Sequence, residues 1–416
     1  MIPYDTAYTI VSVPSVNITF PAVTSKSHIA VGPGGYFCYG FVSRVVNSVV
    51  GCGMISNASY SIAQLRTTFG IPASNVRVAI GESSKYACFI VSLNQGSRSR
   101  SALFTCVNLR TQELFGPVEV PLSYTTTVQS AYAQSLDIIV SDALGSFCFA
   151  HSVSTQTSAE CRFISSFTST AYSAPLLNTD SPVVLTSTSP WNDLIIFTAA
   201  NTSGVRLLPL SPIQPVPSLQ WTSVSGQSLD STVPVHLHGI MSHNYAYFCA
   251  TASSTVRSRI RYCIGTSSGE THFSSSSDSA SAVFGETYFT PNDNVTCTAF
   301  SSDTRAPEVS CSSLISGSTF RQYFYGQNGS QCSIKISPDG GKVYALYGDV
   351  SSALMRANLY NNTTTTSEYS QYFFSKFESG FVMYNDSYAV LPHCSSLNYI
   401  FPGRNCSVCF SIAGRL

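Results

Sequence analysis

Residues 76–109 read VRVAIGESSKYACFIVSLNQGSRSRSALFTCVNL, and this stretch decides the fold. It holds three apolar runs, VRVAI, YACFIVSL and ALFTCVNL, which are separated by polar turns. Alternating β-branched and aromatic residues between such turns are typical of antiparallel strands. Cys88 and Cys106 lie in the second and third runs, where residues of neighbouring strands can face each other within disulfide range. The stretch therefore predicts a small sheet stapled between its two middle strands.

The same arrangement recurs along the chain. The pairs are Cys38 and Cys52, Cys88 and Cys106, Cys148 and Cys161, Cys249 and Cys263, and Cys297 and Cys311, and a last cluster holds Cys394, Cys406 and Cys409. The first cysteines of successive groups lie 50, 60, 101, 48 and 97 residues apart, so the two long intervals are close to double the short ones. A strand-built repeat of about 40 to 50 residues is the signature of a propeller.

Eight units of three apolar runs can be followed through the sequence. They span residues 28–55, 76–109, 136–164, 181–210, 233–265, 282–314, 332–360 and 380–412, and the fourth and seventh lack the central cysteine pair. We therefore expect an all-β chain, a single β-propeller of eight blades (seven in the alternative count), with four-stranded antiparallel blades and disulfides within the blades. The one helical candidate is the short segment 60–68, YSIAQLRTT.

The two ends of the chain bear on how the ring closes. The last unit has no room for a fourth strand after Ile412, whereas residues 8–20, YTIVSVPSVNITF, have the pattern of a strand. We expect residues 1–25 to form an arm and 26–416 to form the propeller. The arm can close its own ring, which removes exposed sheet edges, or insert into a neighbouring molecule. The strand pairing is the same in both cases, so the sequence leaves them open.

A local motif supports the fold. Residues 336–344, ISPDGGKVY, resemble the strand–turn–strand hairpin of many secreted β-propellers. They also resemble the Asp-box of sialidase-type propellers, with Tyr344 in place of the usual Trp. The resemblance covers nine residues and implies a fold only, because the motif is a turn in which Asp339 caps the backbone and Gly340 or Gly341 takes a positive φ.

The cysteines and the glycosylation sequons indicate an oxidising compartment. The chain has 14 cysteines, of which Cys332 stands outside the pairs; we expect one of Cys406 and Cys409 to bond within unit eight and the other to reach Cys332. The N-x-S/T sequons, which predict N-glycans, are at Asn17, Asn57, Asn201, Asn294, Asn328, Asn361, Asn362, Asn385 and Asn405. We expect a secreted or cell-surface glycoprotein.

Charge and hydropathy exclude several classes of partner. Only 10% of the residues are charged and the net charge is zero, which argues against nucleic acid and anionic membrane surfaces as partners. No apolar run reaches the length of a membrane span. The first residues, MIPYDTAYT, do not resemble a signal peptide, so we expect a mature form or a fragment.

Candidate chemistry is sparse. His236, His238 and His243 form an H-x-H pattern with a third histidine, which could bind zinc or copper. We interpret them instead as channel-facing or solvated histidines on the inner strand of unit five. The lone C-x-x-C of Cys406 and Cys409 is interpreted as a disulfide site rather than a metal site. We therefore expect no metal and no cofactor.

Enzymatic candidates are limited to scattered acids. Glu82, Asp142, Glu286 and Asp349 lie near strand ends, where we expect them to cap turns, and no pair with glycosidase spacing is identifiable. The Ser/Thr tracts 274–281 and 363–367 are interpreted as exposed loops that could carry O-glycans.

The leading hypothesis is a non-enzymatic extracellular structural or adhesive glycoprotein that self-associates, such as the repeating subunit of a surface fibre or coat. A glycan-binding, lectin-like propeller is the alternative, and a sialidase or other glycosidase is the third candidate. The lectin would use tyrosines as stacking platforms, although aromatic residues of this kind mostly pack between blades.

Overall fold

A computed structural model describes the strands and many of the tight turns between them. The described residues are 9–12, 18–20, 24–43, 48–56, 59–61, 67–69, 73–93, 101–121, 133–153, 155–175, 177–178, 184–191, 194–201, 204–210, 222–224, 234–242, 244, 246–254, 259–265, 271–277, 282–302, 308–323, 331–336, 340–348, 352–358, 364–369, 382–385, 388–394 and 406–414. No helix among them is long and apolar enough to cross a membrane.

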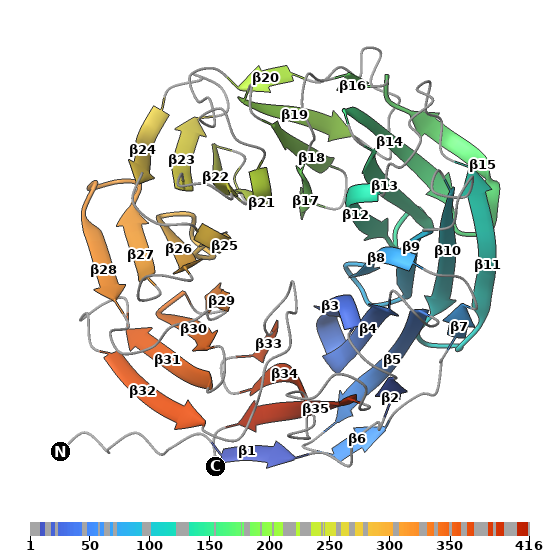
Figure 1. Ribbon diagram of the computed structural model, residues 1–416, viewed down its shortest axis with the longest axis horizontal. Helices are drawn as coiled ribbons and strands as arrows, with labels where there is room; N and C mark the ends of the chain where they lie inside the picture. Colours follow the sequence, from blue (N-terminus) through green and yellow to red (C-terminus); the bar gives the residue numbers. More distant parts are fainter. Residues whose placement is uncertain are drawn as a thin grey trace.

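The described strands pair into eight antiparallel sheets, which lie around a common centre (Figure 1). The first four sheets contain, from the centre outward, β3 (Thr24–Val31), β4 (Tyr36–Ser43), β5 (Ser48–Ser56) with both β6 (Ser59–Ser61) and β7 (Thr67–Phe69); β8 (Ala73–Ile80), β9 (Tyr86–Leu93), β10 (Ser101–Asn108), β11 (Leu114–Pro121); β12 (Ala133–Ser141), β13 (Ser146–Val153), β14 (Gln156–Phe163) with both β15 (Ser166–Ser173) and β16 (Leu177–Asn178); and β17 (Val184–Trp191), β18 (Leu194–Asn201), β19 (Gly204–Leu210), β20 (Thr222–Val224).

The other four sheets follow the same order. They contain β21 (Pro234–Met241), β22 (Tyr247–Ser254), β23 (Arg259–Gly265), β24 (Thr271–Ser277); β25 (Ala282–Phe289), β26 (Val295–Ser302), β27 (Glu308–Ser313), β28 (Thr319–Tyr323); β29 (Gln331–Ile336), β30 (Lys342–Gly348), β31 (Ser352–Asn358), β32 (Thr364–Tyr369); and β33 (Val382–Asn385), β34 (Tyr388–Cys394), β35 (Cys406–Gly414) with both β1 (Thr9–Ser12) and β2 (Ile18–Phe20). Each sheet corresponds to one unit of the sequence, and the units are numbered accordingly. This confirms an all-β propeller with four-stranded antiparallel blades.

The last sheet is completed by the start of the chain. β1 pairs with the end of β35, from Ser411 to Gly414, and β2 pairs with its beginning, from Cys406 to Val408. The inner strand β33 also contacts both β29 and β3, so the first and last units are neighbours in the ring. Within the single chain, the N-terminal arm therefore supplies the outer strand that unit eight lacks.

Apolar residues between consecutive sheets form the core. The packing between units two and three centres on Phe104, whose ring centroid lies 5.3 Å from that of Phe147 and 4.7 Å from that of Phe149. All three side chains are fully buried. Because each sheet packs on the next, burying both faces requires apolar residues at successive positions, as in β9 and β10, where all but the first residue are buried.

Two local expectations are wrong. Short strands take the place of the helical candidate at both ends of 60–68, because β6 pairs with one end of β5 and β7 with the other. Backbone pairing with a sheet edge outweighs a weak local helical preference. The Ser/Thr tracts 274–281 and 363–367 are not loops where described: residues 271–277 and 364–369 are the outermost strands β24 and β32.

Two turns are described in part or in full. Residues 32–35 form a tight turn containing the short 3-10 helix η1 (Pro33–Gly35) before β4. Gly340 in the SPDGG motif has φ of 72°, a conformation that only glycine adopts without cost. Asp339 lies outside the described residues.

Candidate functional site

Five disulfides join the second and third strands of units one, two, three, five and six. In every case the two cysteines are direct register partners, and their Cα atoms lie 4.0 to 4.1 Å apart. They are the pairs that the spacing predicts. Loops of 13 to 18 residues are closed in this way, each worth about 3 kcal/mol in the chain-entropy description of disulfides.

Each disulfide faces the following unit in the ring. Cys88 and Cys106 lie in one buried cluster with Phe147 and Phe149 of unit three. The other four bonds pack in the same way: Cys38–Cys52 against Val76 and Val78, Cys148–Cys161 against Leu185 and Phe197, Cys249–Cys263 against Phe289, and Cys297–Cys311 against Ile334 and Val343. The cysteines are 0–3% exposed, so these bonds are core elements that a reductant cannot reach without unfolding.

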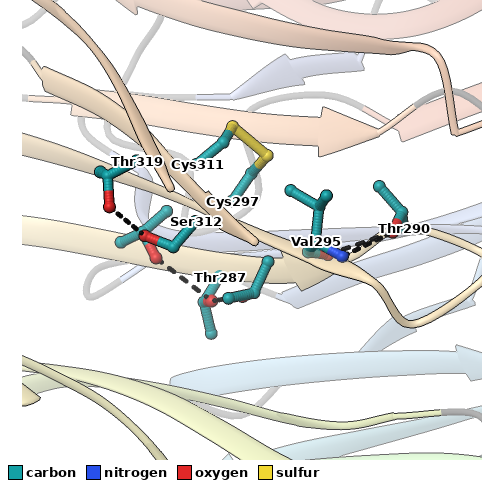
Figure 2. Close-up of a disulfide and its surroundings, with 9 residues drawn as sticks. Thr287, Thr290, Val295, Cys297, Cys311, Ser312 and Thr319 are labelled. Atoms are coloured by element: carbon teal, nitrogen blue, oxygen red, sulfur yellow. Dashed lines mark hydrogen bonds between the residues drawn. A yellow bond between two sulfur atoms is a disulfide. The ribbon is translucent and has the colours of Figure 1, made fainter. Parts of the chain in front are cut away.

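The opposite face of unit six carries a group of buried hydroxyls. Figure 2 shows the Cys297–Cys311 bond on one side of the sheet and Thr287 on the other. The Thr287 hydroxyl hydrogen-bonds to those of Thr296 and Thr298 at 3.2 and 3.3 Å, and all three residues are almost fully buried. Unit six thus presents these hydroxyls, together with Phe289, to unit five, whereas units two and three meet through phenylalanines.

The remaining cysteines do not repeat this geometry. Cys394 is paired in register with Val408, between the two candidate partners Cys406 and Cys409, and Cys409 is opposite His393. Cys332 is opposite Tyr347. Neither candidate faces Cys394 directly, so the bonding of these four cysteines stays a prediction.

Three sequon asparagines fall within the described residues, each in or next to the end of a strand. Asn201 ends β18, Asn385 ends β33, and Asn294 lies in the turn before β26. Asn294 is partly exposed, whereas the hydroxyl-bearing Thr296 of its sequon is fully buried. The other six, Asn17, Asn57, Asn328, Asn361, Asn362 and Asn405, lie outside the described residues. N-glycosylation stays a prediction.

Two of the four acids predicted to cap turns, Glu82 and Asp142, cap backbone groups across two units, whereas Glu286 lies within the strand β25. The Asp142 carboxylate in unit three accepts hydrogen bonds from the backbone N–H groups of Ser83, Lys85 and Tyr86 in unit two, at 2.7, 3.0 and 2.8 Å, and one from the Ser83 hydroxyl at 2.8 Å. The Glu82 carboxylate accepts in return from the N–H groups of Asp142 and Ala143, both at 2.9 Å. Their oxygens are thus used in holding the two turns together. Asp349 is not described.

Other turns between first and second strands interlock similarly. Asp293 accepts from the N–H of Asn244 in the preceding unit at 2.8 Å, and the Ser84 hydroxyl donates to the Pro33 carbonyl at 2.6 Å. At Gly81 a Cβ atom would lie only 2.1 Å from Asp142 Oδ1, so this position requires glycine. Sequence reasoning missed Asp293, although an acid in this turn at the repeat interval was the available signal.

The inner strands are also joined by polar contacts. His28 Nδ1 accepts from the N–H of Val78, and His238 Nδ1 accepts from that of Thr287, both at 3.3 Å. Arg77 Nε lies 3.9 Å from Asp137 Oδ1. The hydroxyl of Ser135 accepts a hydrogen bond from the N–H of Leu185 at 2.7 Å. Every one of these contacts links an inner strand to that of the next unit.

The metal hypothesis gains no support from this geometry. His236 and His238 lie on one strand, β21, but His243 is outside the described residues, and Nδ1 of His238 is engaged by Thr287. Where the structure describes side chains, no three His, Cys, Asp or Glu residues lie close enough to hold a metal ion.

Unit three contains ionisable groups in its buried interior that sequence reasoning missed. Glu160 and Arg162, two residues apart on β14, form an ion pair with a 2.7 Å Oε2–Nη2 distance, and their side chains are 5% and 8% exposed. Arg162 also donates to the Phe167 carbonyl. His151 on the adjacent strand β13 is fully buried, and burial lowers its pKa to about 3.

We expect the buried His151 to make stability fall in mild acid. Its pKa is about 3 in the folded chain and about 6.5 when exposed, so below pH 6.5 the unfolded state binds the proton preferentially. The contribution to stability is complete above pH 6.5 and is lost as pH falls towards 3. At pH 5 the loss in the free energy of unfolding is about 2 kcal/mol. Urea unfolding of the wild type and His151→Gln at pH 7.5 and 5 checks this, since the other titrating groups cancel in the difference. Equal pH dependence in both proteins would contradict it.

Solved structures identify the fold but no activity. No protein-family model matches the sequence, and no curated protein matches it either. The WD40 domain of SCAP from fission yeast is similar, with a TM-score of 0.58 and 10% identity over 98% of both chains. The Dos1 propeller has a TM-score of 0.56 and 10% identity, over 96% of this chain and 95% of that one. Dihydro-heme d1 dehydrogenase NirN has a TM-score of 0.52 and 12% identity, over 88% of this chain and 75% of that one. At such identities the likeness concerns architecture alone: the chain folds as a β-propeller.

Proposed function

We propose that the protein is a non-enzymatic extracellular structural or adhesive glycoprotein, the repeating subunit of a surface fibre or coat. The observation that carries the proposal is that the disulfides and the best-placed acids are engaged in holding the units together. The five disulfides lie buried between units, and the two best-placed acids, Glu82 and Asp142, have their oxygens occupied by backbone N–H groups. These groups contribute rigidity rather than reactivity.

The same bonds support an extracellular compartment. Structural disulfides form and persist in oxidising surroundings, such as the extracellular space, and are rare in the cytosol. A chain with 10% charged residues has few ionic groups to keep it in solution, and N-glycans at strand ends such as Asn201 and Asn294 would supply that hydration. Both arguments favour a secreted glycoprotein.

The N-terminal arm offers the route to self-association. β1 and β2 provide only four and three residues of pairing with β35, and the same hydrogen bonds would form if the arm came from a second copy. Exchange of an identical element between copies is a low-cost way to assemble. An arm exchanged around successive copies would give a fibre.

Electron microscopy and light scattering of the native glycoprotein test this proposal. We expect fibres or higher oligomers, and only single rings after deletion of residues 1–20. A control in which Thr9 alone is replaced by serine should assemble normally. A native protein that stays monomeric overturns the fibre. Reproducible binding on a glycan array would favour the lectin alternative, and turnover of aryl glycosides the glycosidase.

A further inference from the structure

Two histidines make the same contact in different units. His28 is the fifth residue of β3 and His238 is the fifth residue of β21. Each directs Nδ1 at the backbone N–H of a residue in the next inner strand, Val78 in β8 and Thr287 in β25, both at 3.3 Å. In Figure 1, β3 and β21 lie on opposite sides of the ring's centre. The contacts therefore hold the ring at two opposite points.

This contact depends on the protonation state of the imidazole. A nitrogen that accepts a hydrogen bond must carry no proton, so each histidine is in the neutral form with its proton on Nε2. A second proton on Nδ1 turns the acceptor into a donor facing another donor. Both side chains are partly exposed, so protons can reach them from solvent.

The titratable residues on the strands that pack against the two histidines can be named from the sheet arrangement. The titratable residues on the elements packed against His28 are Arg77, Tyr36, Tyr39 and Tyr384, with Lys26 on its own strand. The titratable residues on the strands packed against β21 are Glu286, Tyr288 and Tyr247, with His236 on β21 itself. Carboxylates, tyrosines, lysine and arginine ordinarily change charge outside the range from about pH 5.5 to 7.5.

The residues that precede the two donor amides in the sequence have opposite charges. Arg77 immediately precedes Val78 and is balanced by Asp137 at 3.9 Å. His238 lies against the Tyr288 ring, with centroids 5.0 Å apart, and Glu286 immediately precedes Thr287. In each case, protonation would place a positively charged imidazolium beside the strand whose amide the neutral imidazole binds.

We propose that His28 and His238 are a pair of acid-sensitive latches, whose protonation in mildly acidic medium releases the next inner strand at two opposite points of the ring. The hydroxyl contact between Ser135 and Leu185 joins units three and four by a group that does not titrate. It provides a built-in reference, because that junction should stay closed when the two histidine junctions loosen.

Amide-resolved hydrogen exchange at pH 7.5 and 5.5, corrected for intrinsic rates, tests the proposal. Losing the acceptor should speed exchange of the Val78 and Thr287 amides by about five- to tenfold, whereas Leu185 should stay unchanged. His28→Asn and His238→Asn keep an acceptor, because Oδ1 occupies the position of Nδ1 and does not titrate. Each should abolish the response at its own junction only.

The controls separate a latch from general acid softening. His272→Asn, in the outer strand β24, should leave both responses intact. If an asparagine variant fails to fold, the wild-type comparison of Val78 and Thr287 with Leu185 still decides. Equal acceleration at all three amides, no acceleration at Val78 and Thr287, or a response that persists in the asparagine variants would each overturn the proposal.

Discussion

Replacing Glu160 with alanine is expected to lower the free energy of unfolding by about 3–5 kcal/mol. The substitution leaves the Arg162 guanidinium buried without its carboxylate, at a position where the arginine side chain is 8% exposed. The hydrogen bond from Arg162 to the Phe167 carbonyl does not neutralise the charge. Urea unfolding followed by fluorescence measures the loss.

A double substitution separates the penalty of leaving one buried charge unpaired from the net contribution of the ion pair to stability. Glu160→Met together with Arg162→Met removes both charges and fills similar volume, so we expect it to be far less destabilising than either single charge removal. Glu160 and Arg162 are two residues apart on β14, so their side chains lie on the same face of the strand. Arg162 contacts Phe167 on this face, so apolar replacements would meet the phenylalanine cluster of units two and three. Additive losses in the single and double variants would contradict this expectation.

The repeat, the strands and the five central disulfides could be predicted because they depend on local patterns. Period-two alternation predicts the two strands that contain Cys88 and Cys106, and the hairpin between these strands brings the two cysteines opposite each other. The last unit departs from this pattern. Its strands put Cys394 opposite Val408, a register that depends on a long connection between residues 394 and 406 rather than on a tight hairpin.

The contacts between units could not be predicted, because they join residues a whole repeat apart. Asp142 caps amides 56 to 59 residues earlier, and His28 accepts from an amide 50 residues later. Nothing local distinguishes a carboxylate that caps its own turn from one that caps the neighbour's. Likewise, the burial of Glu160 depends on how two sheets pack, since it alternates with Ala159 and Cys161 along β14 and would face water in a single sheet.

Asp142→Ala is expected to destabilise the protein by about 3–4 kcal/mol. The carboxylate accepts four hydrogen bonds from residues 83–86, and it is 6% exposed, so water replaces it poorly. Three backbone N–H groups of the unit-two turn lose their acceptor at once. Asp142→Asn keeps one oxygen acceptor and the side-chain shape, and should lose about half as much.

Glu113→Ala is the matched control, since it removes the same charge from an exposed position in the neighbouring turn and should stay within about 0.5 kcal/mol of wild type. Glu82→Ala tests reciprocity. Its carboxylate holds the N–H groups of Asp142 and Ala143, so the two acids clamp the same pair of turns from opposite sides. Their losses should therefore be less than additive, because the second removal acts on turns that the first has already freed. Strict additivity would mean that each turn keeps its shape without the other, and the junction would then be two separate caps rather than one clamp.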